Sequence, residues 1–164
     1  MLLGIDLGGT KIEGIVLKSR ENPEEVIRHR VNTEEEKGYS QVISNIKSLV
    51  DYIESNINHK FSKLGIGTPG TIDPESGLLK NSNSQCLNGM PIQKDLSKVL
   101  NKSILIQNDA NCFALAETLL GSVKDQHPNA KNVFGIIMGT GVGGGIIIDG
   151  KTVYGSCFVT YSRQ

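Results

Sequence analysis

Residues 4–11 read GIDLGGTK, and this stretch decides how the fold begins. A short apolar run over residues 2–7 ends there in two glycines, and residues 11–17 resume an alternating apolar pattern. Such a pattern on both sides of a glycine pair is typical of two strands joined by a tight turn. We therefore predict that a β-hairpin opens the chain.

A second glycine-rich stretch, GTGVGGG at 139–145, also lies between two predicted strands, at 133–138 and 142–148. Asp149-Gly150 then supplies a hairpin turn. Because glycine has no Cβ, a turn built from it lets backbone N–H groups approach phosphate oxygens closely, and two such turns can grip a triphosphate from both sides. Each turn alone is also compatible with a tight hairpin and nothing more. Their joint occurrence favours phosphate binding.

Two better-known phosphate-binding motifs match the residues of this sequence, but the predicted secondary structure around them does not fit either motif. Residues 145–152, GIIIDGKT, satisfy the P-loop pattern, yet three isoleucines and a hairpin signal stand where a loop and a helix start are needed. Residues 139–144 contain GxGxxG, which in a dinucleotide site opens a helix, whereas here a strand follows. Neither motif is interpreted as functional.

Between the glycine stretches, the pattern alternates strands and helices. The charged segment 18–37 is typical of an edge strand with solvated flanks, and an apolar stripe predicts a helix over 39–57. A strand at 64–67 comes next, followed by a loop rich in Asn and Ser that extends to about Pro91, and loops of that length tend to be functional. The other predicted elements are a helix at 92–100, a buried strand at 103–107, and a helix at 110–120 with Asn108 or Asp109 at its N-cap. The order is βββαβαβα.

Composition excludes several classes of function. The 164 residues carry 17 basic and 17 acidic side chains, so no basic field exists to hold nucleic acid. The longest uncharged stretch, 132–148, is broken by glycines and falls short of the ~20 apolar residues that a membrane span needs. The start lacks the pattern of a signal or transit peptide, so we expect a cytoplasmic protein. Cys86, Cys112 and Cys157 are odd in number and far apart, which predicts reduced thiols.

Four motifs in order give the chain a family resemblance: GIDLGGTK at 4–11, GTPG at 67–70, NDANCFALAE at 108–117 and GTGVGGG at 139–145. From Met1 to about Ser156 it resembles the ROK sugar kinases. The resemblance implies an α/β fold of the actin-like ATPase (ribonuclease H-like) type and ATP-dependent phosphorylation of a hexose hydroxyl with Mg²⁺. NSNSQCLNGMPI at 81–92 resembles the fructokinase and mannokinase branch, which we take as the main expectation. GTGVGGGIIIDGK resembles N-acetylglucosamine kinases, which is the alternative.

The resemblance also assigns roles to single residues. Asp109 is the expected general base and contacts the sugar, and its competing role from sequence is that of a helix N-cap. Asp6 is expected to hold Mg²⁺ directly or through water. The remaining sugar-side residues are Gly70, Asn83 and Asn108. The residues expected around the nucleotide are Gly4, Asp6, Gly8, Gly9, Thr10, Lys11, Gly139, Thr140, Gly141, Val142, Gly143 and Gly144.

We expect a first domain over residues 1–122, and a linker with the start of a second domain over 123–164. Family members continue with an ExGH motif, a zinc-binding cluster and an adenosine motif, none of which occurs here, so we expect a fragment without a zinc site and with weak nucleotide binding. Strands after Lys131 would expose apolar surface and favour self-association. Alternatives of another class are a non-catalytic nucleotide-binding module and a ROK-type regulator, although a DNA-binding domain has no room before the first glycine turn. The expected partners are a sugar and ATP, and a homo-oligomer stays open.

Overall fold

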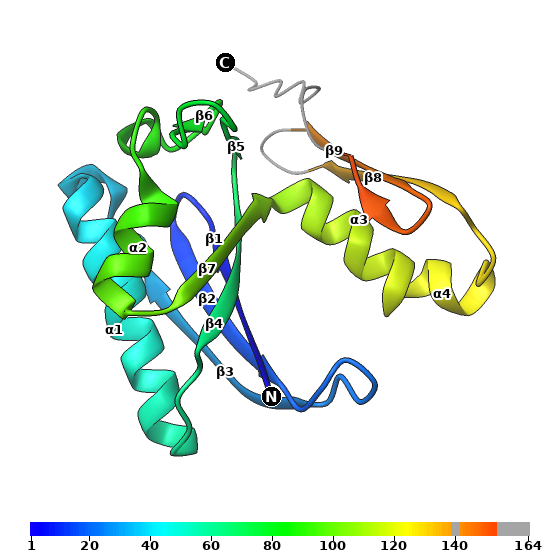
Figure 1. Ribbon diagram of the computed structural model, residues 1–164, viewed down its shortest axis with the longest axis horizontal. Coiled ribbons are helices and arrows are strands. Elements are labelled where there is room, and N and C mark those ends of the chain that lie inside the picture. The colour runs from blue at the N-terminus through cyan, green and yellow to red at the C-terminus, as the bar shows by residue number, and fades with distance from the viewer. Residues whose placement is uncertain (139–141, 154–164) are drawn as a thin grey trace. The chain divides into compact units, whose positions relative to one another are not determined.

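The computed structural model describes residues 1–138 and 142–153. The chain divides into two compact units between Gln107 and Asn108 (Figure 1). The compact units divide at this point because the helix that follows Asn108 packs against the strands of the second unit, and the domain boundary at 122/123 stays a prediction. Within the described ranges, no helix is both long and apolar enough to cross a membrane.

The first unit is built on a five-stranded sheet in the order β3-β2-β1-β4-β7. Its strands are β1 (Leu2–Leu7), β2 (Lys11–Leu17), β3 (Glu25–Asn32), β4 (Lys63–Thr68) and β7 (Ser103–Asn108). β1 and β2 form the predicted antiparallel hairpin, and β3 pairs with β2 as the predicted edge strand. β1 and β4 run parallel (Figure 1). The sheet is therefore mixed, as the predicted order of elements requires.

Helices α1 (Tyr39–Ile57) and α2 (Ile92–Leu100) occupy the predicted ranges to the residue. Both end at an asparagine in the left-handed region, Asn58 with φ 50° and Asn101 with φ 54°, a conformation that asparagine tolerates. The apolar stripe of α1 is buried together with alternate residues of the sheet. The most deeply buried side chains of this core include Leu7, Ile12, Val16, Ile46, Leu49, Ile53, Ile66, Ile92 and Leu96.

A buried carboxylate ties the end of α1 to the rest of the first unit. Glu54 is 2% exposed, and its Oε1 lies 2.7 Å from Lys102 Nζ and accepts a hydrogen bond from Phe61 N at 2.8 Å. Its Oε2 lies 2.9 Å from Lys60 Nζ. Burial by itself raises the pKa of Glu54, but these partners outweigh it and hold the pKa below its usual value. The charge is thus fully compensated inside the protein.

The long loop predicted between β4 and α2 contains some regular structure. β5 (Thr71–Ile72) and β6 (Leu79–Lys80) pair antiparallel, and a short 3-10 turn covers Gln85–Leu87. Asp73 closes the connection between the two strands: its Oδ1 accepts hydrogen bonds from Glu75 N and Ser76 N at 3.0 Å. Its other oxygen lies 2.6 Å from Lys80 Nζ. This ribbon gives the segment before Pro91 a defined shape.

Strand β7 corrects the prediction of a buried strand at 103–107. It stands last in the sheet order, and Leu105 is 65% exposed while Ile104 is buried. The run Ile104-Leu105-Ile106 is continuously apolar, which is typical of a strand covered on both faces. Here only alternate residues reach the core, so an edge strand carries the same apolar run.

The second unit combines helices α3 (Asp109–Leu119) and α4 (Ser122–Gln126) with strands β8 (Asn132–Met138), β9 (Val142–Ile148) and β10 (Lys151–Thr152). The strands pair antiparallel in the order β10-β9-β8. Asp149 and Gly150 both have positive φ, 48° and 73°, as the predicted hairpin turn requires. Residues 145–152 therefore run strand, turn, strand, which confirms that they are not a P-loop. Helix α4 was not predicted.

Helix α3 rests directly on glycines of β8 and β9. A Cβ placed on Gly135 would lie 2.9 Å from Ala114 Cβ, and one on Gly143 would lie 3.4 Å from Ala110 Cβ. A Cβ on Gly145 would overlap the carbonyl oxygen of Ala110. These three glycines, which we call the glycine floor, bring the helix backbone into contact with the strands.

The other face of this sheet is apolar and open. The register places Phe134 opposite Ile146 and Met138 opposite Val142, on the side that does not face α3. Phe134, Ile136 and Met138 are 64%, 52% and 80% exposed. We call Phe134, Ile136, Met138, Val142, Ile146 and Ile148 the outer face of the second unit.

Candidate functional site

The first glycine turn joins β1 to β2 and presents free backbone donors. Gly8 N donates to Lys11 O at 3.0 Å, and a Cβ on Gly8 would lie only 3.0 Å from that same oxygen, so glycine suits this position. The N–H groups of Gly9 and Thr10 find no acceptor among the residues that the structure describes. These two amides are the groups that the predicted phosphate contact requires.

The turn touches two other segments of the first unit. A Cβ on Gly9 would lie 3.5 Å from Ser84 Oγ and 3.7 Å from Glu35 Oε2. That Glu35 oxygen is buried and has no hydrogen-bond partner in residues 1–138 and 142–153. Burial and the nearby Glu35 carboxylate raise the pKa of the Cys86 thiol, so Cys86 is a poor nucleophile. The glycine turn and the Asn- and Ser-rich loop thus meet at Gly9.

The other predicted nucleotide residues of this unit lie on the strands beside the turn. Asp6 is exposed near the end of β1, where it pairs with Glu13 on one side and Gly67 on the other. Lys11 is exposed at the start of β2. Gly4 lies within β1, opposite Ile15 and Gly65, and so belongs to the sheet rather than to the turn. Asp6 and Lys11 therefore carry the charges closest in sequence to the free amides.

The predicted sugar-side residues of the first unit lie on the ribbon and the loop after it. Gly70 has φ +86°, and a Cβ there would lie 2.5 Å from Lys80 O, so only glycine fits the GTPG turn. Asn88 is committed to the backbone: its Oδ1 accepts from Ser82 N and its Nδ2 donates to Ser82 O, both at 2.9 Å. Asn88 is therefore occupied by the loop itself, whereas the exposed Asn81 and Asn83 make no side-chain hydrogen bond in the described part of the chain, and the sugar-binding role of Asn83 stays a prediction.

Asn108 and Asp109 stand where β7 runs into α3. Asn108 is the N-cap: its Oδ1 accepts hydrogen bonds from Ala110 N at 3.0 Å and Asn111 N at 3.2 Å. Asp109 is the first helical residue, which settles the two N-cap candidates in favour of Asn108. The Asp109 Oδ1 accepts from Ala110 N at 2.8 Å.

Asp109 is half-buried, and burial raises the pKa of its carboxyl although hydrogen bonds from Ala110 N and from the Asn108 side chain oppose the shift. A raised pKa makes a carboxylate a stronger proton acceptor at neutral pH. This combination of burial and a fixed orientation suits a general base.

The described part of the second glycine stretch, residues 142–145, packs against the first turn of α3. Gly139, Thr140 and Gly141 lie outside the described residues, whereas Val142, Gly143 and Gly144 start β9. Gly143 belongs to the glycine floor under α3, and Asn111 Oδ1 accepts from Ile146 N at 3.3 Å. A Cβ on Gly144 would lie 3.0 Å from the Phe134 ring. Packing therefore favours glycine at position 144 but leaves room for a Cβ at position 143, and a phosphate role for either residue stays a prediction.

Several groups around the first turn carry no signal in the sequence. Thr33, Glu35 and Ser84 all lie beside it, yet they are remote from it along the chain and follow no motif. Their only sequence clue is their polar character next to predicted strand or loop ends.

Cys86 and Cys112 form no disulfide, and Cys157 lies outside the described ranges.

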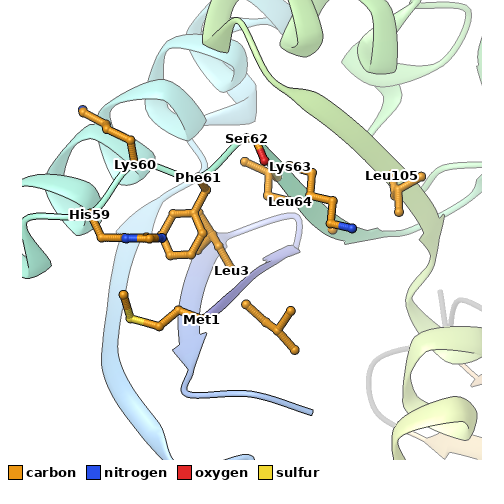
Figure 2. A pocket seen from close by; sticks show the side chains of 11 residues that line it. Met1, Leu3, His59, Lys60, Phe61, Ser62, Lys63, Leu64 and Leu105 are labelled. Atoms are coloured by element: carbon orange, nitrogen blue, oxygen red, sulfur yellow. The ribbon is translucent and has the colours of Figure 1, made fainter.

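A hollow of about 410 Å³ lies at the opposite end of β1 and β4, away from the glycine turn (Figure 2). Leu3, Phe61 and Leu64 contribute to its wall, and the His59 ring stands edge-on to Phe61 with centroids 4.8 Å apart. None of the described candidate site residues lines it. The hollow is therefore not part of the candidate site.

The described residues contain no group of three or more His, Cys, Asp or Glu side chains that could hold a metal ion.

Comparison with known proteins agrees with this geometry. A family described as the ROK family matches residues 2–160. The N-acetyl-D-glucosamine kinase of Aliivibrio fischeri is 40% identical over 155 residues, which cover 94% of this chain and 48% of the relative. The chain thus spans about half the length of the curated relatives it matches.

Solved structures show the same partial coverage. A ROK hexokinase from Thermus thermophilus matches with a TM-score of 0.78 and 28% identity, over 94% of this chain and 49% of that one. A ROK family glucokinase from Streptomyces griseus, solved with glucose and AMPPNP, matches with a TM-score of 0.76 and 26% identity, over 98% and 48%. The predicted actin-like ATPase fold is confirmed by these likenesses.

Proposed function

This chain belongs to the ROK family, and on that premise we propose that it supplies one phosphate turn and the catalytic base of an ATP-dependent N-acetylglucosamine kinase. The observation that carries the proposal is the half-buried Asp109 at the start of α3, whose pKa burial raises. Relatives that match the chain across this segment bear the name of that enzyme.

The sugar assignment departs from the main expectation drawn from the sequence. NSNSQCLNGMPI at 81–92 resembles the fructokinase and mannokinase branch, but curated relatives such as the Aliivibrio fischeri protein are named N-acetyl-D-glucosamine kinase. Within that segment, Asn88 serves the loop itself by binding the backbone of Ser82. Part of the fructokinase-like pattern is therefore structural, and the alternative is better supported.

Asp109 accepts the proton in the proposed reaction. As a sugar hydroxyl oxygen forms its bond to the γ-phosphorus, the Asp109 carboxylate takes the hydroxyl proton, and the bond from that phosphorus to the leaving ADP oxygen breaks. The helix start and the Asn108 side chain hold the carboxylate in one orientation. Fixed orientation matters because phosphoryl transfer depends mainly on positioning and electrostatics.

The first glycine turn receives phosphate in this proposal. The free N–H groups of Gly9 and Thr10 donate to phosphate oxygens, and the ammonium group of Lys11 adds a positive charge. Asp6 offers the hard carboxylate oxygen that Mg²⁺ prefers, and one or two such ligands suffice because Mg²⁺ keeps several waters. A bound Mg²⁺ would neutralise charge on the transferred phosphoryl group.

Sugar recognition is assigned to Gly70, Asn83 and Asn108. Gly70 shapes the turn before the ribbon, and the free Asn83 amide can both donate to and accept from hydroxyl groups. The side-chain Oδ1 of Asn108 accepts the hydrogen bonds that cap the helix, so Asn108 acts on the site chiefly by orienting Asp109.

The test joins this chain, at the exposed Asp149-Gly150 turn, to the second half of a relative. Two donors are used, the Aliivibrio fischeri N-acetylglucosamine kinase and the Streptomyces griseus glucokinase. ADP release is measured with MgATP and N-acetylglucosamine, glucose or fructose. We expect the chimera with the Aliivibrio half to use N-acetylglucosamine, as its donor's name indicates, and the chimera with the Streptomyces half to shift from glucose towards N-acetylglucosamine. Folded chimeras with no sugar-dependent turnover would refute the kinase proposal, and a shift towards fructose would refute only the sugar.

A further inference from the structure

Thr33 binds the first glycine turn from a distance of 25 positions in the chain. Its Oγ1 donates to Gly8 O at 2.7 Å, and its N–H donates to Thr10 O at 3.0 Å. The residue has an exposed fraction of 0%. One buried side chain and its own backbone thus hold the carbonyl groups on both sides of Gly9.

Thr33 is itself held in place by helix α1. Asn45 Nδ2 donates to Thr33 O at 3.1 Å and to Asn32 O at 3.2 Å. Gln41 Nε2, one helical turn earlier, donates to Asn45 Oδ1 at 2.9 Å and so fixes the orientation of that amide. The glycine turn is therefore attached to the packed helix as well as to its own hairpin.

Planarity of the peptide bond carries this restraint to the amides. The carbonyl of Gly8 and the N–H of Gly9 belong to one planar trans unit and point in opposite directions. Because Thr33 draws the Gly8 carbonyl inward, the Gly9 N–H points away from Thr33. The same reasoning links the Thr10 carbonyl to the Lys11 N–H.

We propose that Thr33 is the positioning residue of the phosphate turn: its hydroxyl keeps the Gly9 amide directed outward before any nucleotide arrives. The inference rests on the proposed function, because it presumes that this turn receives phosphate. It adds a residue that lies in none of the four family motifs. Preorganised donors bind an anion more strongly, since no ordering is needed at the moment of binding.

The experiment compares three variants of the 164-residue chain. Thr33→Val keeps the shape and removes the hydroxyl, and Thr33→Ser keeps the hydroxyl. Thr118→Val is the matched control, because it deletes a threonine hydroxyl that donates to Ala114 O, also at 2.7 Å, in the second unit. Affinity for MgATP is measured by titration calorimetry, and exchange of the Gly9 and Lys11 amides by NMR without nucleotide.

We expect Thr33→Val to weaken MgATP binding about fivefold, the worth of one hydrogen bond, and to speed exchange of both amides. Thr33→Ser should restore both values, and Thr118→Val should change neither. Equal MgATP affinity of wild type and Thr33→Val would overturn the role of Thr33 alone. A wild-type chain that does not bind MgATP would instead contradict the proposed function, and in that case unchanged amide exchange in Thr33→Val would overturn the positioning role as well.

Discussion

Replacing Asp109 by asparagine should separate catalysis from stability and move them in opposite directions. Asparagine has nearly the same shape, and its Oδ1 can still accept the hydrogen bond from Ala110 N at 2.8 Å. The helix keeps its cap, because Asn108 supplies it. What the variant loses is the ability to take a proton, so we expect turnover of the chimeric kinase to fall by about 10²–10⁴-fold with little change in the KM for sugar.

The stability change follows from the pKa of Asp109, which burial raises above its ordinary value of 3.8. A carboxyl with a raised pKa in the folded state contributes its stability below the ordinary pKa and loses it as pH rises through the folded pKa. At neutral pH the charged carboxylate therefore costs stability, whereas the neutral amide that replaces it in the variant carries no such cost. Asp109→Asn should raise the melting temperature at pH 7 and match wild type below pH 3.8, the ordinary pKa of the carboxyl.

Thermal unfolding of the 164-residue chain across this pH range and ADP release from the chimera are the two assays. Asp109→Ala is the control: it also loses the hydrogen bond to Ala110 N, so its gain in stability at pH 7 should be smaller than that of Asp109→Asn. Near-normal turnover with saturating sugar in the asparagine variant would remove Asp109 from catalysis. A lower melting temperature at pH 7 would refute the reasoning about burial.

Three further perturbations test the fold. Glu54→Ala leaves the nearly buried Lys102 without its partner and should lower the free energy of unfolding by about 3 kcal/mol, measured by urea unfolding. Because the pKa of Glu54 is lowered in the folded protein, this difference from wild type should shrink as the pH falls below 4.5, the ordinary pKa of a glutamate. Gly70→Ala meets both a positive φ and Lys80 O, so it should lower the melting temperature more than Gly77→Ala, which has a similar φ of +71° but no atom within 4 Å. Ile136→Lys on the outer face should reduce self-association in sedimentation velocity, and a wild-type chain that stays monomeric at all concentrations would contradict the role of that face.

Secondary structure is predicted most accurately from the sequence where a single local cause decides it. Helix α1 matches its predicted range because an uninterrupted apolar stripe fixes both its length and its buried face. The antiparallel pairings of β1 with β2 and of β8 with β9 follow in the same way from strand alternation. Neighbouring residues contain all the information that these elements need.

Prediction failed where partners distant in the chain decide the outcome. β7 appears buried from its own residues, and only the order of the sheet shows that it is an edge. Asn108 and Asp109 are equally good caps by type, and the strand that runs through Asn108 makes the choice. Thr33 gives no signal at all, because its importance lies in two hydrogen bonds to a turn formed much earlier in the chain.

The glycine floor under α3 bears on how related chains should be interpreted. Gly135 and Gly145 are required by the helix that lies on them, because a Cβ at either position would overlap Ala114 or Ala110, whether or not a nucleotide ever binds nearby. A descendant that lost its chemistry would still need these glycines in order to fold. Retention of Gly135 and Gly145 in a homologue is therefore evidence of shared packing, whereas retention of a carboxylate at the position of Asp109, where we expect asparagine to be more stable, is evidence for the proposed catalytic role.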